Sequence, residues 1–265
     1  MKIAAVISDV DGTLVTDDKV LTRRAQWAVA ALADAGIAFS IISSRPPRGL
    51  RMLIEPLGLT RPMAGFNGGA LVDSQLSPTR VHLLPRAVAR RAIDFIARRG
   101  ADAWLFTVQD WLLRDPHAPY VALEEHTVRF PPRVVPDFTG SIERAAKIVA
   151  VSEDFALLKA LAAEARAAFA GQANVALSQR YYLDFTHPRA NKGAALLELA
   201  ELMSVPPAQI GVIGDGENDV AMFREGGLSI AMGNAAADVQ RAADRVTGTN
   251  AQDGFADAVE RFVLA

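Results

Sequence analysis

The chain is built around the segment Ile3-Ala4-Ala5-Val6-Ile7-Ser8-Asp9-Val10-Asp11-Gly12-Thr13-Leu14. Its first residues form a short apolar run, which is typical of a strand buried on both faces of a parallel sheet. The run ends in Asp9 and Asp11, two carboxylates with one residue between them. Residues two apart in an extended chain point to the same side, so we expect both carboxylates to face one pocket at the carboxyl end of the strand. Gly12 allows the backbone to turn sharply after the pair.

Two carboxylates this close repel each other unless a cation lies between them or one of them holds a proton. A bound cation and a shared proton are both typical of a catalytic or metal-binding site. The plain alternative is an acidic turn that merely ends a strand, because this composition is common in turns. A calcium-binding EF-hand loop begins in a similar way, but it needs Asp or Asn at its fifth position and Glu at its twelfth. This chain has Thr13 and Val20 there, so calcium binding of that kind is not expected.

Composition excludes several other classes of protein. The 265 residues include 28 Lys and Arg against 30 Asp and Glu, a net charge of −2 that favours neither a nucleic-acid partner nor a membrane surface. Cysteine is absent, so a disulfide framework and thiolate chemistry are excluded. The amino-terminal apolar run is too short for a secretory signal, and no run approaches the ~20 apolar residues of a membrane span. We therefore expect a soluble, cytoplasmic protein; its oligomeric state is not defined by the sequence.

Both ends of the chain show strands alternating with helices. Residues 22–35 and 48–57 are predicted helices, and residues 37–42 and 63–66 are predicted strands. The same rhythm returns near His187, with helices predicted at 192–203, after 218, from 235 and at 253–263, and strands at 210–213, 228–231 and 245–247. This order predicts an α/β fold with a doubly wound, parallel, Rossmann-like sheet formed by residues 1–82 and 186–265.

Residues 83–185 show a different pattern and read as an inserted α+β domain. Strands are predicted at 103–108, 111–114, 147–151, 174–178 and 181–185, with helices at 86–99 and 153–170. The stretch 116–136 is rich in proline and is predicted to be irregular. The arginines of the 86–99 helix are interpreted as a solvated face rather than a nucleic-acid patch, because no aromatic residues alternate with them.

Polar groups follow four of the predicted core strands, and one sheet brings its carboxyl-end loops to a single edge. The groups are Asp9 and Asp11, then Ser43 and Ser44, then Asn67, then Asp215, Asn218 and Asp219, with Lys192 opening a helix between the last two sets. Each group alone has an ordinary structural explanation as a turn, a cap or a surface helix start. Together they supply oxygen ligands suited to Mg²⁺ and donors suited to phosphate oxygens.

Four motifs in this order resemble the haloacid dehalogenase superfamily, most of all its Cof-like, class IIB phosphatases. They are Asp-Val-Asp-Gly-Thr-Leu at 9–14, Ser-Ser-Arg-Pro at 43–46, Asn-Lys-Gly at 191–193 and Gly-Asp-Gly-Glu-Asn-Asp-Val-Ala-Met at 214–222. The resemblance covers essentially the full length. In that family a mixed α/β cap is inserted between the second and third motifs, where this chain places residues 83–185.

The resemblance implies a role for each matching residue. Asp9 would be the nucleophile that becomes an aspartyl phosphate, and Asp11 the general acid and then base. Lys192 would neutralise charge on Asp9 and the phosphate. Asp215 would bind Mg²⁺ together with Asp9 and Asp11, the latter through its backbone carbonyl, and Asp219 would support the metal from nearby.

The same resemblance implies a phosphate- and substrate-binding set: Ser43, Ser44, Arg45, Asn67 and Asn218. Ser43 would hold a phosphoryl oxygen. The family usually has Thr-Gly-Arg where this chain has Ser-Ser-Arg, so the hydroxyl is retained but Ser44 replaces a smaller residue.

These features predict a Mg²⁺-dependent phosphatase of a small phosphorylated metabolite, such as a sugar phosphate or a similar phosphomonoester. A phosphomutase of the same superfamily is the alternative within this chemistry. A receiver module that phosphorylates an Asp is a third reading, disfavoured because receivers need no acid like Asp11; a silent binding protein is disfavoured because no charged catalytic group is missing. Five aromatic residues of the insert are interpreted as core residues or as the wall of a sugar site: Trp104, Trp111, Tyr120, Tyr181 and Tyr182.

Overall fold

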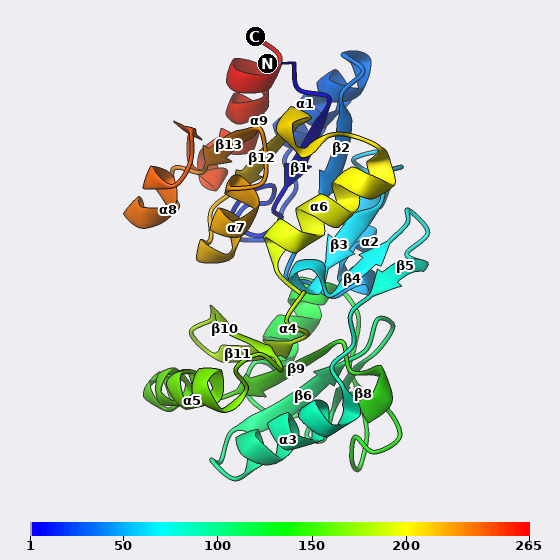
Figure 1. The fold of residues 1–265 in the computed structure, drawn as a ribbon, viewed down its shortest axis with the longest axis vertical. Coiled ribbons are helices and arrows are strands. Elements are labelled where there is room, and N and C mark those ends of the chain that lie inside the picture. Colours follow the sequence, from blue (N-terminus) through cyan, green and yellow to red (C-terminus); the bar gives the residue numbers. More distant parts are fainter. Residues whose placement is uncertain (1) are drawn as a thin grey trace.

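The computed structural model describes residues 2–265 and shows two bodies, a core and a cap, one above the other in Figure 1. The core contains a five-stranded sheet whose strands are all parallel, in the order β14-β13-β12-β1-β2. Its strands are β1 (Ala5–Ser8), β2 (Ala38–Ile41), β12 (Ile210–Gly214), β13 (Leu228–Ala231) and β14 (Arg245–Val246). β1 is entirely buried, as its apolar sequence predicts.

Helices cover both faces of this sheet. α1 (Arg23–Asp34) and α9 (Gly254–Ala258) pack on one face, and α6 (Lys192–Met203) and α7 (Val220–Phe223) on the other. Side chains cap two of these helices: Thr22 accepts a hydrogen bond from the backbone N–H of Ala25, and Asn191 accepts one from that of Ala194. The cap at Asn191 fixes the start of α6 and so the position of Lys192.

A small antiparallel sheet extends the core towards the cap. It comprises β3 (Met63–Gly65), β4 (Ala70–Val72) and β5 (Pro78–Val81). A single parallel bridge between Ile42 and Ala64 joins it to the main sheet. The remaining short core helices are η1 (Pro47–Leu50), α2 (Arg51–Ile54), η2 (Phe66–Gly68), η4 (Pro207–Gln209), η5 (Glu217–Asp219), α8 (Ala237–Arg241), η6 (Asn250–Gln252) and the closing π-helical turn η7 (Val259–Val263).

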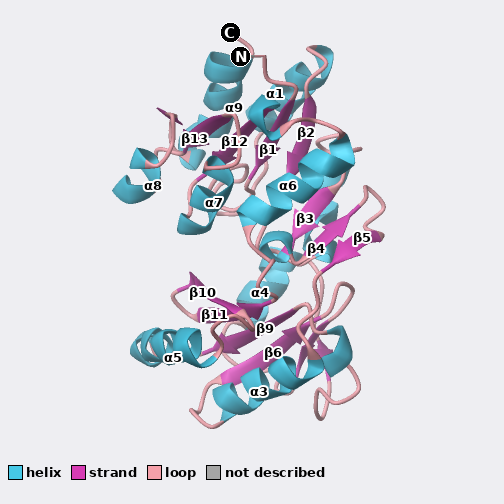
Figure 2. Ribbon diagram, in the orientation of Figure 1, coloured by secondary structure: helices cyan, strands magenta, loops and turns pink. Residues whose placement is uncertain are grey.

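The cap contains a six-stranded, mostly antiparallel sheet in the order β10-β11-β9-β6-β7-β8. Figure 2 labels four of its strands, β10, β11, β9 and β6. The strands are β6 (Asp102–Phe106), β7 (Trp111–Leu113), β8 (Arg133–Val134), β9 (Lys147–Val151), β10 (Asn174–Gln179) and β11 (Tyr182–Thr186). α3 (Arg86–Ala97) and α5 (Phe155–Ala168) pack on its outer face, and η3 (Ile142–Arg144) precedes β9. α4 (Val121–Val128) packs on the inner face, between the cap sheet and the core in Figure 1.

The predicted fold class is confirmed: a doubly wound parallel core with a separate α+β cap. Two local predictions are wrong. The stretch 116–136 is not irregular, because it contains α4 and β8. The predicted helix 48–57 is a 3-10 turn followed by the single turn of α2. Among the described residues, no helix is both long and apolar enough to cross a membrane.

Candidate active site

The loop after β1 brings Asp9 and Gly12 to the carboxyl edge of the core sheet. Gly12 has φ +82°, in the left-handed region that favours glycine. A Cβ at this position would lie 2.3 Å from Oδ2 of Asp215, so the loop after β12 can approach only because position 12 has no side chain. This close approach places the carboxylates of the first and fourth motifs side by side.

Lys192 lies at the centre of the site and is buried, with 1% of its surface exposed. Its Nζ donates to Oδ1 of Asp9 and to Oδ1 of Asp219, each at 2.5 Å. Burial lowers the pKa of Lys192, but Asp219 and Asp9 outweigh burial and raise the pKa above its usual value. The ammonium therefore stays charged and holds the Asp9 carboxylate in place.

Three carboxylates converge here: one oxygen from each of Asp9, Asp215 and Asp219 lies within 4.8 Å of the others. Burial raises the pKa of Asp9, and burial together with the Asp219 charge raises the pKa of Asp215 to about 6. Lys192 alone thus does not offset the crowded negative charge. A hard divalent cation would do so, and an oxygen-only donor set fits Mg²⁺.

Neighbouring groups orient these carboxylates. Thr13 Oγ1 donates to Asp215 Oδ1 at 3.1 Å, and Asn234 Nδ2 donates to the Gly12 carbonyl at 2.9 Å and to Asp215 Oδ2 at 3.3 Å. Asp219 Oδ2 accepts hydrogen bonds from the backbone N–H groups of Asp215 and Gly216. Asp219 is therefore committed to Lys192 through one oxygen and to the fourth-motif loop through the other.

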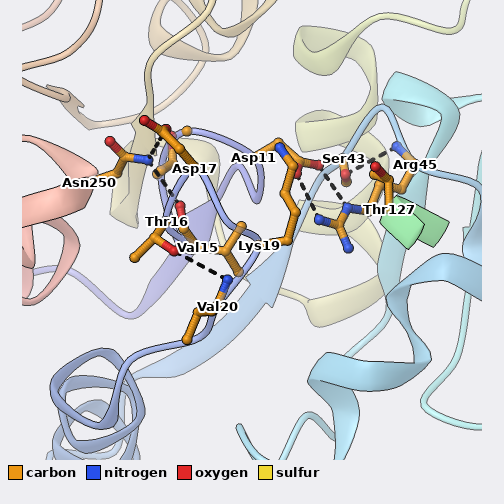
Figure 3. Close-up of polar contacts among 12 residues, drawn as sticks. Asp11, Val15, Thr16, Asp17, Lys19, Val20, Ser43, Arg45, Thr127 and Asn250 are labelled. Carbon is orange, nitrogen blue, oxygen red and sulfur yellow. Dashed lines mark hydrogen bonds and ion pairs between the residues drawn. The ribbon is translucent and has the colours of Figure 1, made fainter. Parts of the chain in front are cut away.

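Asp11 has different partners from Asp9. Its carboxylate accepts from Arg45 Nε and Nη2, both at 2.7 Å, and pairs with Lys19 Nζ at 2.9 Å (Figure 3). Burial raises the pKa of Asp11, but Arg45 and Lys19 outweigh it and lower the pKa to about 2. The carboxylate is thus held ionised, whereas a general acid that works near neutral pH needs a raised pKa. Arg45, predicted to bind phosphate, is occupied by Asp11 here.

Lys19 reaches Asp11 from a short braced loop. Thr16 and Val20 are hydrogen-bonded to each other across it, and Asn250 Nδ2 donates to the Val15 carbonyl at 3.2 Å and to Asp17 Oδ1 at 3.0 Å (Figure 3). Asn250, which lies just before α9, therefore helps to position the loop that follows the first motif.

The remaining predicted binding residues lie around the same edge. Ser43 is fully buried, and its Oγ accepts from the backbone N–H of Arg45 at 3.1 Å. Asn67, with φ 56°, accepts from Asn218 Nδ2 at 3.0 Å, which joins the third strand's loop to the fourth motif. Ser44 lines a cleft between the core and the cap.

This interdomain cleft, with about 100 Å³ of open space, runs from Asp11 and Arg45 to the cap. Its cap wall consists of Leu123, Glu124, Thr127, Lys147, Ser178, Gln179, Tyr181 and Tyr182. Trp104 and Trp111 are buried in the cap core, and Tyr120 stacks on Tyr181 with 4.3 Å between ring centroids. Of the five aromatic candidates, Tyr181 and Tyr182 therefore contact the cleft.

Sequence reasoning missed Thr13, Lys19 and Asn234 at this site. Asn234 follows β13, so the rule that polar residues after core strands meet at one edge would have found it. Thr13 lies within the first motif and was noted only as an unsuitable calcium ligand. Lys19 carries no such signal, because its position depends on how the loop folds back.

Known proteins resemble the chain over nearly its whole length. A family model described as haloacid dehalogenase-like hydrolase matches residues 6–259. A 5-amino-6-(5-phospho-D-ribitylamino)uracil phosphatase of Bacillus subtilis is 26% identical over 96% of this chain and 95% of its own. The crystal structure of a haloacid dehalogenase-like hydrolase from Bacteroides thetaiotaomicron is 27% identical, with a TM-score of 0.89 over 98% of this chain and 99% of that one. A subclass IIB sugar phosphatase, 19% identical, shares the fold with a TM-score of 0.83 over 100% of both chains.

Proposed function

Since the chain belongs to the haloacid dehalogenase-like hydrolases, we propose that it is a Mg²⁺-dependent phosphatase of a small phosphorylated metabolite, such as a sugar phosphate or similar phosphomonoester. The observation that carries the proposal is Lys192, buried between Asp9 and Asp219 with Asp215 alongside. A buried cation beside a carboxylate nucleophile is what the attack on an anionic ester requires, because nucleophile and substrate repel each other.

In the proposed reaction an Asp9 carboxylate oxygen attacks phosphorus. The bond from phosphorus to the leaving oxygen breaks, its electron pair goes to that oxygen, and Asp11 supplies the proton. Water then attacks the phosphorus of the aspartyl phosphate while Asp11 takes a proton from it, which releases inorganic phosphate and restores Asp9. Since Arg45 and Lys19 hold Asp11 ionised, these contacts must loosen before Asp11 can carry a proton to the leaving group.

Asp9, Asp215 and the backbone carbonyl of Asp11 would hold Mg²⁺, with Asp219 supporting it, and the ion would offset the negative charge shared by phosphate and carboxylates. Ser43 and Asn218 would contact phosphoryl oxygens, and Ser44, Asn67 and Arg45 would complete the substrate-facing edge.

The proposed division of labour follows the two bodies. Residues 1–82 and 186–265 would form the catalytic core and residues 83–185 the cap that selects the leaving group, with Thr186, the last residue of β11, at the boundary. A cap over an open sheet edge excludes water and contacts the part of the substrate that the core does not. A cytoplasmic location, and the absence of nucleic-acid and membrane partners, stay predictions.

A hydrolysis screen tests this proposal. We expect phosphate release from sugar phosphates or related phosphomonoesters, loss of activity in chelator and recovery when Mg²⁺ is added. Full activity without metal would contradict it, and transfer of phosphate to a second substrate position without release would instead identify the phosphomutase.

Two variants test whether Asp215 is a ligand of the proposed Mg²⁺ ion. Asp215→Ala is expected to raise the Mg²⁺ concentration for half-maximal activity about tenfold or more, because a charged ligand is lost. Asp18→Ala, an equal loss of charge on an exposed residue, serves as the control. Equal half-maximal concentrations for both variants would remove Asp215 from the metal site.

A further inference from the structure

The inner face of the cap sheet carries a buried ion pair that the phosphoryl chemistry does not use. Lys147 on β9 is 6% exposed, and its Nζ donates to Oδ2 of Asp184 on β11 at 2.8 Å. Nζ also lies 5.6 Å from the ring centroid of Phe106. An ammonium has three protons, and in residues 2–265 the bond to Asp184 is the one side-chain hydrogen bond that the Lys147 ammonium makes. Because Lys147 lines the interdomain cleft, its remaining protons are available to a molecule bound there.

Further buried polar atoms gather around this pair. Tyr182 Oη, Ser178 Oγ and Asp184 Oδ1 have no hydrogen-bond partner among the described residues, and Tyr182 and Ser178 line the same cleft. Tyr182 and Asp184 are 7% and 4% exposed. Buried polar atoms without partners are costly and call for an explanation, which a bound ligand supplies.

Glu124 supplies an acceptor on the same wall. It lines the cleft from α4, and while burial is the main cause of the raised pKa of Tyr182, the nearby charge of Glu124 raises it further. Lys147 lies near enough to lower the pKa of Glu124, which burial raises. The cap wall therefore offers donors at Lys147 and Tyr182 beside an acceptor at Glu124.

The charges around the cleft balance. Asp11 is paired with Arg45 and Lys19, and Lys147 is paired with Asp184. Glu124 adds one negative charge beside that second pair. Each cation at the cleft already has a carboxylate partner, so a second anionic group on the substrate would compete with Asp11 or Asp184 and would also meet the negative charge of Glu124. A hydroxyl group both donates and accepts, and so suits this mixed wall.

We propose that Lys147, positioned by Asp184, and Glu124 form a leaving-group subsite that selects neutral, polyhydroxylated leaving groups over anionic and over purely apolar ones. The proposal rests on the phosphatase function above and deepens it. Lys147 and Glu124 are specificity-determining contacts, and Asp184 is a positioning residue that acts through Lys147.

Three six-carbon substrates test the selectivity: sorbitol 6-phosphate, 6-phosphogluconate and n-hexyl phosphate. They share the phosphate ester and differ in hydroxyl groups and terminal charge. For the unchanged protein, kcat/KM is expected to be at least ~10-fold higher for sorbitol 6-phosphate than for either other substrate, since each hydrogen bond to a charged group contributes at about this level.

Lys147→Met removes the ammonium but keeps the length of the side chain. It is expected to lower kcat/KM for sorbitol 6-phosphate ~10- to 100-fold and to change that for n-hexyl phosphate less than ~3-fold. Lys159→Met, the same substitution on the exposed side of α5, is the matched control. Lys147→Met leaves the buried Asp184 unpaired and could prevent folding, so the double variant Lys147→Met/Asp184→Asn is measured as well. Glu124→Gln, at a half-buried residue, tests the other side of the subsite. Glu124→Gln is expected to raise kcat/KM for 6-phosphogluconate relative to kcat/KM for sorbitol 6-phosphate, because it removes a negative charge beside the substrate's carboxylate.

The outcomes separate the two proposals. If the unchanged protein hydrolyses none of a broad set of phosphomonoesters, p-nitrophenyl phosphate included, the phosphatase function itself fails. If it hydrolyses them but prefers 6-phosphogluconate or n-hexyl phosphate, or if every variant keeps the original ratios, the subsite is overturned while the phosphatase function stands. Equal losses on all three substrates would assign Lys147 a purely structural role and likewise overturn the subsite.

Discussion

Lys192 shows at the level of one residue how stability and function depend on the same contact. It lies between Asp9 and Asp219, all three buried. Removing one partner of such a group leaves the others charged and uncompensated in a low-dielectric site. The lysine therefore stabilises the folded state and also serves the proposed attack.

Lys192→Met is expected to lower the free energy of unfolding by about 3–5 kcal/mol in metal-free buffer, as breaking a buried ion pair does. Urea denaturation measures this difference. Part of the loss should be recovered in Mg²⁺, which would offset the charges of the same carboxylates. The exposed substitution Lys159→Met should change stability by less than about 0.5 kcal/mol. A Lys192→Met protein as stable as the original would contradict the observed network.

Asp9 and Asp11 also show what a residue-level rule can and cannot predict. The two-residue spacing predicts that both carboxylates face one pocket. However, β1 ends at Ser8, so alternation along an extended strand does not continue through this pair. Asp9 faces Lys192, whereas Asp11 faces Arg45 and Lys19. The pairing with Lys19 depends on a loop contact that local sequence does not encode.

At the level of elements, one side chain links the last two strands of the core sheet, in addition to their backbone pairing. Asp244 precedes β14 and accepts hydrogen bonds from the backbone N–H and the hydroxyl of Ser229 on β13, at 2.9 and 2.8 Å. These hydrogen bonds lower the pKa of Asp244. A carboxyl with a lowered pKa in the folded state stabilises the fold at pH values above its unfolded pKa of about 3.9. That contribution is lost as the pH falls through the folded pKa.

Asp244→Ala is accordingly expected to reduce the free energy of unfolding by about 1 kcal/mol near neutral pH, a modest value because the side chain is exposed. Thermal unfolding from pH 7 down to about pH 3 follows the difference. The gap between the two proteins should stay constant to about pH 5 and narrow below about pH 4. A gap that widens on acidification would reverse the assigned sign; Asp18→Ala is the control.

Long elements were easier to predict than short ones. α6 has the predicted bounds, Lys192–Met203, because its apolar residues recur at helical spacing and Asn191 caps it. α4 escaped prediction because it is short and lies between proline-rich segments, with left-handed residues Tyr120 and Arg129 at its ends. Its helical form is stabilised by packing of Val121 and Val128 against the cap sheet, a tertiary contact.

At the level of the whole molecule, the parallel core was predictable because alternating strands and helices permit few topologies. The presence of a separate inserted body was predictable from the change of pattern at residues 83–185. Its contact with the core was not: α4 faces the core and places Thr127 beside Arg45 in Figure 3, and no local pattern specifies that orientation.

The proposed division between core and cap predicts that cap variants change substrate preference but not Mg²⁺ dependence. Gln179→Ala and Tyr181→Ala on the cap wall should change the ranking of kcat/KM values among large phosphomonoesters, because both residues line the cleft in which the leaving group is proposed to bind. They should leave the half-maximal Mg²⁺ concentration within about twofold of the original value, since no cap side chain belongs to the carboxylate cluster. Cap variants that change metal dependence but not substrate ranking would refute this division.

Asp9 is proposed to be the nucleophile and Asp11 to transfer protons, and acid-quenched mass spectrometry with p-nitrophenyl phosphate distinguishes these two roles. This ester has a good leaving group, so Asp11→Asn should permit the first step but slow hydrolysis of the aspartyl phosphate. We expect a phosphate covalently attached to Asp9 in the Asp11→Asn protein and none in the Asp9→Asn protein. Phosphorylated Asp9→Asn protein, or an Asp11→Asn enzyme fully active on alkyl phosphates, would contradict it.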